Sequence, residues 1–229
     1  MSELLTTAEY TQIAQNLTLP NKAFIDGKFV DAISGQTMPT ENPATGEILT
    51  EIASCQSEDV DLAVANAKAA FESGAWSSLS PAERKEAVLK LADLIEENAL
   101  ELAVMETLEA GKPIHECVKT DLPETVECIR WYAEAADKVY DQISPTSGDA
   151  LATVTREAVG VVACVLPWNF PLMMLAWKLG PALMMGNSVI IKPAESTSMT
   201  TLRVAELAIE AGIPAGVFNV LPDLNPVKR

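Results

Sequence analysis

Three short apolar runs in the last third of the chain constrain its fold more than any other feature. They cover residues 159–166, 188–192 and 217–221, are rich in Val and Ile, and are separated by two segments of helix length. Their starts lie roughly thirty residues apart, which is the spacing of a strand–helix–strand repeat. Because their hydrophobicity is continuous, we expect strands that are buried on both faces of a parallel sheet. Three strands and two crossovers predict a doubly wound α/β fold of which one mononucleotide-binding half is present.

Turn residues divide the beginning of the chain into short strands. Asp26-Gly27 stands between two apolar runs, which predicts a β-hairpin over residues 24–30. A second turn signal at residues 42–46 precedes an expected strand over residues 47–53.

Capping residues and apolar periodicity predict several helices after these strands. Ser80, Pro81 and Glu83 form a capping box with proline at the first helical position. Ser57 is expected to cap a further helix, and other helices are expected to end near Ala110 and to begin near Asp121. Residues 1–20, in contrast, are polar and without pattern, so we expect a flexible leader.

A different pattern separates these helices from the three apolar runs. Residues 142–149 are rich in Ser, Thr and Gly. In residues 150–157, one set of alternate positions holds Leu151, Thr153 and Thr155, and the other holds Ala152, Val154 and Arg156. Alternation of this kind is typical of a strand with one exposed face.

The excess of acidic residues narrows the classes of partner. Sixteen Lys and Arg residues oppose thirty-two Asp and Glu residues, so the formal charge is −16. Nucleic-acid backbones and anionic membrane surfaces are therefore not expected as partners. Residues 159–185 are apolar over a length that could span a bilayer, but Asn169, Lys178 and three prolines interrupt them. We expect this stretch to be buried core.

Cysteine and histidine content favours a reduced protein without a metal. The four cysteines show no CxxC spacing, and His115 is the single histidine, which cannot complete a zinc site alone. Residues 1–10 carry two glutamates and no basic cluster before an apolar run, so no secretory leader is expected. These features predict a cytoplasmic protein.

Asn169 is a candidate for chemistry because it follows the first apolar run. Ligands of an open parallel sheet bind beyond the carboxyl ends of its strands. Pro167 and Pro171 fix the backbone on both sides of Asn169, and a side-chain amide held there suits a developing oxyanion. The alternative, which the spacing alone favours, is that Asn169 caps the next helix and Trp168 packs in the core.

Lys192 and Glu195 follow the second run and offer a cation and a carboxylate three residues apart. Both can reach the vicinal hydroxyls of a ribose. The alternative is an exposed ion pair, with residues 196–198 capping the next helix. The sequence has no G-x-G-x-x-G fingerprint, so it gives no support to an ordinary dinucleotide site.

Several motifs together resemble the aldehyde dehydrogenase superfamily. They come in order and at that family's spacings, and the resemblance extends from about residue 24 to residue 220. The motifs are PWNFP at 167–171, GNSVIIKPAE at 186–195, GIPAGVFNV at 212–220, EAGKP at 109–113 and IRWYA at 129–133. Within the family, the chain looks most similar to enzymes for ω-amino and γ-glutamylamino aldehydes.

The resemblance implies an aldehyde substrate and a site for NAD, with NADP also possible. In this family a cysteine thiolate attacks the aldehyde, and an asparagine amide holds the resulting oxyanion. Asn169 would be that donor, while Lys192 and Glu195 would bind the adenosine ribose. Glu195 favours NAD because a carboxylate repels a 2′-phosphate, although Lys192 could compensate. The residues implied to line the cofactor cleft are Val165, Leu166, Pro167 and Trp168.

The resemblance also implies a division of the chain. Residues 21–140 and 159–229 would form an incomplete, Rossmann-like cofactor-binding domain, and residues 141–158 look like the family's oligomerisation arm. After residue 220 the sequence departs from the family's glycine-containing turn, and no residue matches the nucleophile or the general base. We therefore expect the catalytic domain to be absent, the chain alone to be inactive, and cofactor binding to be weak.

Three interpretations remain open at this point. The first is the cofactor-binding portion of an aldehyde dehydrogenase, and the second is a non-catalytic half-fold that associates with a full-length subunit. The third is an unrelated doubly wound protein. A half sheet would leave an apolar edge exposed, so poor solubility or association with other chains is expected.

Overall fold

The computed structural model describes residues 4–223, and its central element is a five-stranded mixed sheet. The residues 224–229, where part of the departure from the family pattern falls, lie outside the described residues. The strand order is β2 (Lys28–Val30), β1 (Ala23–Ile25), β9 (Phe218–Val220), β8 (Ser188–Lys192) and β7 (Val161–Val165). The last three are parallel, which confirms the predicted sheet.

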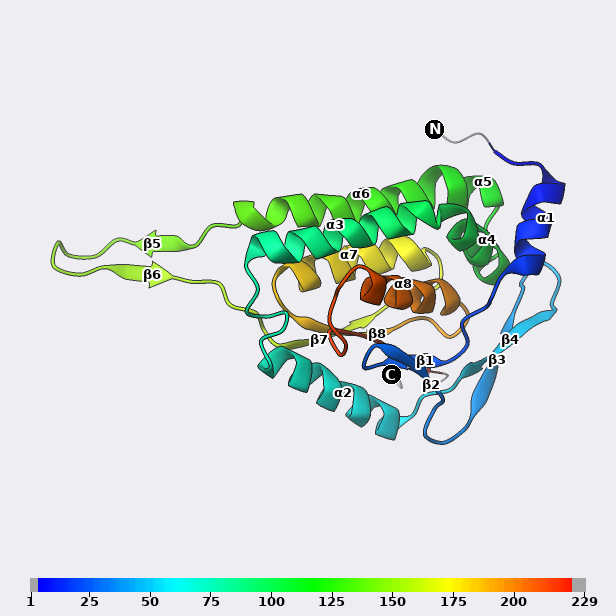
Figure 1. Ribbon diagram of the computed structural model, residues 1–229, viewed down its shortest axis with the longest axis horizontal. Coiled ribbons are helices and arrows are strands. Elements are labelled where there is room, and N and C mark those ends of the chain that lie inside the picture. The colour runs from blue at the N-terminus through cyan, green and yellow to red at the C-terminus, as the bar shows by residue number, and fades with distance from the viewer. Residues whose placement is uncertain (1–3, 224–229) are drawn as a thin grey trace.

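Helices cover both faces of this sheet. The crossover helices α7 (Pro171–Met184) and α8 (Met199–Glu210) lie on one face, with α3 (Pro81–Glu97) and α6 (Leu122–Ala135) stacked beyond them (Figure 1). Helix α2 (Ser57–Glu72) covers the opposite face. Strand β8 lies at the centre of the parallel part, so its first four residues are buried, as the continuous apolar run predicted.

Burial on both faces was wrong for the first apolar run. Strand β7 is an edge strand of the described sheet, and Val165 is 60% exposed while Val159, just before the strand, is 86% exposed. Cys164 alone in the strand is buried. Val161 and Val162 pack against two different core clusters, but no described strand pairs with the outer edge of β7.

The predicted hairpin exists and closes the other side of the parallel strands. Asp26 and Gly27 both have positive φ, 54° and 73°, which a tight two-residue turn between β1 and β2 requires. Phe24 of β1 pairs with Val220 of β9 in antiparallel orientation. The edge that an isolated three-stranded sheet would expose at β9 is therefore covered within the same chain.

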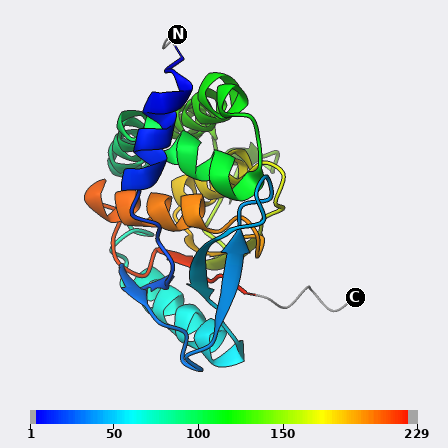
Figure 2. The same cartoon turned by 90° about the vertical axis from the view of Figure 1, so that its right-hand side faces the viewer.

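The first twenty residues differ from the expected flexible leader. Helix α1 (Thr7–Asn16) begins with a capping box of Thr6 and Glu9, and Tyr10 is buried against the main core. The leader prediction was wrong here because a short helix with a single buried aromatic shows little apolar periodicity. After β1 and β2, β3 (Thr37–Glu41) and β4 (Ile48–Ala53) form a separate antiparallel pair, which faces the viewer in Figure 2.

The remaining helices follow the local signals closely. Ser80 and Glu83 form the predicted capping box of α3, whereas α2 is capped one residue earlier than expected, at Gln56. Helix α4 (Ala99–Ala110) ends at Gly111, whose φ of 71° is left-handed. A short helix α5 (Ile114–Glu116), a π-helical turn η1 (Cys117–Asp121) and then α6 follow, and a 3₁₀ turn η2 (Ala136–Lys138) ends this layer.

A two-stranded ribbon projects from the body of the molecule. Strands β5 (Gln142–Ser144) and β6 (Ala152–Val154) pair with each other and with no other strand (Figure 1). Every residue of β6 is exposed, so the prediction of one buried face was wrong within this chain.

Among the helices described, none is both long enough and apolar enough to cross a membrane.

Candidate functional site

The carboxyl ends of β7 and β8 bring the two groups of candidate residues to the same end of the sheet. Val165 is the register partner of Lys192, and the Leu166 N–H donates to the Lys192 carbonyl at 3.0 Å. Leu166 is buried, whereas Pro167 is exposed and Trp168 is 64% exposed. The structure therefore presents a largely apolar, uncovered rim where an open parallel sheet binds its ligands.

Asn169 lies on the loop between β7 and α7 and does not cap the helix. The cap position of α7 is Phe170, and no side chain bonds to the first turn. Asn169 is exposed, and its amide makes no hydrogen bond to another residue between 4 and 223. The capping alternative was wrong, as was core packing of Trp168, and the amide N–H groups of Asn169 are available to an acceptor outside the chain.

Lys192 and Glu195 form a loose ion pair at the end of β8, with 3.8 Å between Lys192 Nζ and Glu195 Oε2. The Lys192 side chain is mostly covered, and that of Glu195 is half exposed. The ion pair that the alternative interpretation of Lys192 and Glu195 expected is thus present. The same interpretation expected residues 196–198 to cap α8, and this was wrong, because Ser198 at the start of α8 makes no side-chain cap.

Glu109 takes the place of that cap, and sequence reasoning missed it. Its buried carboxylate accepts hydrogen bonds from the Met199 N–H at 2.9 Å and the Thr200 N–H at 3.2 Å. Burial raises the pKa of Glu109 to about 7, while the hydrogen bonds from α8 act in the opposite direction. One signal was available: Glu106 and Glu109 continue the apolar stripe of α4 at helical spacing, where an acid needs a buried partner.

One cavity connects these elements near the strand ends. It has a volume of about 470 Å³. Trp168 and Glu195 line it together with Glu109, which supports the predicted proximity of the two loops. Asn169 and Lys192 are not among its lining residues. A larger cavity of about 1140 Å³ lies between α1 and α8, but no candidate residue lines it.

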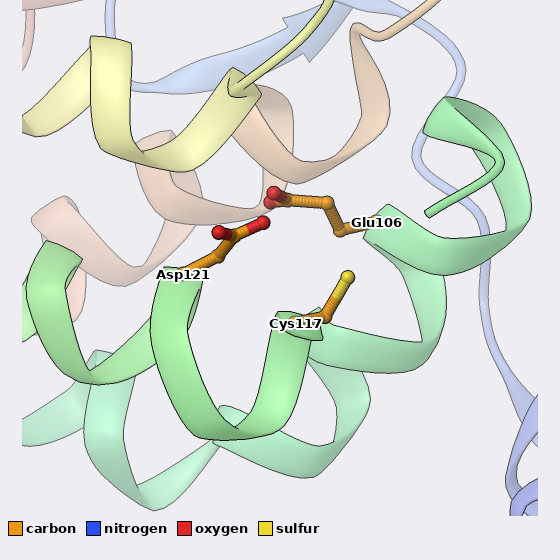
Figure 3. Close-up of side chains that lie close together, drawn as sticks. All are labelled: Glu106, Cys117 and Asp121. Carbon is orange, nitrogen blue, oxygen red and sulfur yellow. The ribbon is translucent and has the colours of Figure 1, made fainter. Parts of the chain in front are cut away.

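A second cluster of polar side chains is buried next to the Asn169 loop. Glu106, Cys117 and Asp121 direct their carboxylates and thiol into one space, with all three donor atoms within 4.8 Å of one another (Figure 3). Lys112 pairs with Asp121 Oδ2, so the cluster already contains a cation. Burial and the neighbouring Asp121 raise the pKa of Glu106 well above its usual value.

The four cysteines do not supply a reactive thiolate at the strand ends. Burial raises the pKa of Cys55 to about 12 and that of Cys117 to about 11, and it also raises the pKa values of Cys128 and Cys164. All four are free thiols. His115 is exposed, and its Nε2 lies 3.0 Å from Glu116 Oε1. Within residues 4–223, burial thus disfavours the thiolate form of every cysteine.

Comparisons with known proteins agree with the fold. The family model "Aldehyde dehydrogenase family" matches residues 29–227. "Aminoacetaldehyde dehydrogenase" of Pseudomonas aeruginosa is 62% identical over 222 residues, which are 97% of this chain and 45% of that protein. "NADP/NAD-dependent aldehyde dehydrogenase PuuC" of Escherichia coli is 49% identical over 208 residues, 91% of this chain and 42% of that protein.

Solved structures give the same result. The aldehyde dehydrogenase KauB from Pseudomonas aeruginosa superposes with a TM-score of 0.95 at 50% identity, covering 96% of this chain and 44% of that one. The P. syringae indole-3-acetaldehyde dehydrogenase AldA, in complex with NAD+ and IAA, gives 0.94 at 52% identity over the same shares. The chain thus spans less than half the length of these relatives.

Proposed function

Because this chain belongs to the aldehyde dehydrogenase family, we propose that it forms the cofactor-binding side of an NAD-dependent aldehyde-oxidising site. The observation that carries the proposal is the pairing of Val165 with Lys192, which sets the two candidate loops side by side at the sheet end. The uncovered rim there, with Val165 and Trp168 exposed, fits a flat aromatic ligand.

The residues of this chain divide the work of such a site. Lys192 and Glu195 would hold the two ribose hydroxyls of NAD, since an ammonium donates to them and a carboxylate accepts from them. The bound dinucleotide supplies a hydride acceptor. Asn169 would donate an amide N–H to the oxyanion that forms when a thiolate adds to the aldehyde, which stabilises that charge more than the neutral carbonyl.

NAD is the proposed cofactor in preference to NADP. The half-exposed carboxylate of Glu195 would repel a 2′-phosphate, and Lys192 offsets only part of this repulsion because it already pairs with Glu195. The similarity to AldA, solved with NAD+, supports the proposal. Small amino aldehydes are the proposed substrate class, and the name of the relative at 62% identity supports this.

We further propose that the 229-residue chain binds NAD weakly and does not oxidise aldehydes by itself. No described cysteine is both ionised and located at the strand ends. The free thiols fit a reducing, cytoplasmic location. On this proposal residues 21–140 and 159–229 form the cofactor-binding domain, of which 224–229 lie outside the described residues.

A second candidate function is association with other subunits through the ribbon of residues 141–158. Its exposed apolar side chains have no described partner in this chain, and large exposed apolar groups mark interaction surfaces. They are Ile143, Leu151 and Val154. Co-purification with a full-length subunit would separate this non-catalytic role from the first proposal.

Replacing Lys192 tests the cofactor site. Lys192→Met is expected to weaken NAD binding about tenfold, because a charge-assisted hydrogen bond to the ribose is lost. Saturation-transfer NMR on the adenosine protons measures this even for a weak complex. The matched control is Lys85→Met, which removes a similarly covered lysine that pairs with Glu134 on the outer helices. Equal NAD binding by both variants would contradict the proposed role of Lys192.

A further inference from the structure

The buried cluster beside the Asn169 loop has an unusual balance of charge. Both carboxylate oxygens of Glu106 and Asp121 Oδ1 are buried, and no donor among residues 4–223 reaches them. The two carboxylates face each other (Figure 3). Two ionised carboxylates this close in a buried site repel strongly, and a single shared proton removes the repulsion. The favourable arrangement is a protonated Glu106 that donates to Asp121, whose other oxygen pairs with Lys112.

Asp121 pairs with Lys112, and Lys112 also contacts the loop that carries Asn169 and Phe170. Lys112 Nζ pairs with Asp121 Oδ2 and lies 4.0 Å from the centre of the Phe170 ring. An ammonium group over an aromatic face is attracted by the electron density of the ring, and more strongly where water is excluded. The Lys112 side chain is 19% exposed and that of Asp121 is 1% exposed, so most water is excluded here.

The contact between Lys112 and Phe170 affects Asn169 because the two loop residues are neighbours in the chain. Phe170 is the residue after Asn169, and it occupies the cap position of α7 without any side-chain cap. Asn169 itself is exposed and makes no hydrogen bond to the described chain. The ring of Phe170, the residue next to Asn169, is therefore a side chain through which Lys112 can act on the position of the Asn169 amide.

We propose that Lys112 is a positioning residue for Asn169, because its ammonium group joins the buried Glu106–Asp121 pair to the ring of Phe170. The π-helical turn η1 contributes to this arrangement, since it ends at Asp121 and carries Cys117 into the same cluster. Only the role of Asn169 as oxyanion donor rests on the proposed function. The positioning itself is a property of the chain alone.

Backbone ¹⁵N relaxation of the full 229-residue chain tests the proposal. In the unchanged protein the order parameters of Asn169 and Phe170 are expected near about 0.85, and in Lys112→Met below about 0.6. Lys112→Arg, which keeps a cation that stacks on rings, is expected to restore the order. Lys85→Met controls for loss of a lysine ion pair elsewhere and is expected to leave the loop unchanged.

A spectroscopic signature separates positioning from general stability. The Hε protons of Lys112 should be shifted upfield by the Phe170 ring, and Phe170→Leu should abolish that shift and loosen Asn169 as much as Lys112→Met does. The double variant should loosen the loop no further, because both changes break one contact. Glu106→Gln should retain the order, since an amide N–H replaces the shared proton.

Three results would overturn the proposal: unchanged order at Asn169 in Lys112→Met, an equal loss in Lys85→Met, or no ring-current shift of Lys112. A loss of order in Glu106→Gln equal to that in Lys112→Met would contradict the proposed proton shared by Glu106 and Asp121. These readouts need no cofactor. Failure of NAD to bind while the loop remains ordered would therefore count against the proposed function alone.

Discussion

The 229-residue chain, incubated with NAD and small amino aldehydes, is expected to form NADH at least about 10⁴-fold more slowly than an intact homologous enzyme. The reason is chemical. Attack on the aldehyde needs a thiolate, and burial raises the pKa values of all four cysteines, so that they stay protonated near neutral pH. Cys164 lies inside β7, and Cys117 and Cys128 come from η1 and α6. Cys55 lies near the end of β9, where its N–H donates to the Pro222 carbonyl, but it is buried.

The assay follows NADH absorbance, with the Escherichia coli relative that is 49% identical as the positive control. Four single Cys→Ser variants of this chain serve as internal controls. NADH formation that depends on the aldehyde and disappears in one of these variants would show that the chain has its own nucleophile. That result would contradict the proposal that this chain supplies the cofactor-binding side of the site but no nucleophile.

The stability of the folded chain is expected to fall as pH rises through neutrality because of Glu109. Its pKa lies near 4.5 when exposed and at about 7 in the fold, where burial disfavours the ionised form. A raised folded-state pKa means that the folded state binds the proton more tightly. The stabilisation is therefore complete below about pH 4.5 and is lost as pH rises to about 7, with a full size of about 3 kcal/mol.

Glu109→Gln removes this titration and leaves the rest of the chain unchanged. Between about pH 5 and about pH 8, the free energy of unfolding of the unchanged protein should fall by up to about 3 kcal/mol more than that of the variant. Urea unfolding at both pH values measures the difference. The pKa of Glu106 is raised mainly by burial and Asp121, which both proteins share, while the smaller effect of the Glu109 charge is lost in the variant. Glu86→Gln, at an exposed position of α3, is the control. Parallel pH profiles for Glu109→Gln and the unchanged protein would show that the hydrogen bonds from α8 keep Glu109 ionised throughout.

Features fixed by nearby residues could be predicted from the sequence. The bounds of β8, the hairpin turn at Asp26-Gly27, the capping box at Ser80 and the stop at Gly111 all depend on residues within a few positions. The parallel orientation of β7 and β8 followed from the spacing of the apolar runs, whereas their register did not. The adjacency of the two candidate loops followed from the same orientation.

Features that depend on distant partners could not be predicted. An apolar run does not reveal whether a neighbour covers it, so the exposure of β7 and of the ribbon was missed. The cap of α8 comes from Glu109, about ninety positions earlier in the sequence than the helix N–H groups it accepts from. Likewise, the contact of Lys112 with Phe170 joins two motifs that the sequence shows only as separate landmarks.

Binding of the cofactor at the ends of β7 and β8 is tested most directly by an ¹⁵N–¹H correlation spectrum recorded during titration with NAD. We expect the shift changes to gather at Val165, Leu166, Trp168 and Asn169 and at Lys192 and Glu195, with a weak, saturable dependence on NAD. Changes confined to the cavity between α1 and α8, or no change at a large excess of NAD, would contradict the account.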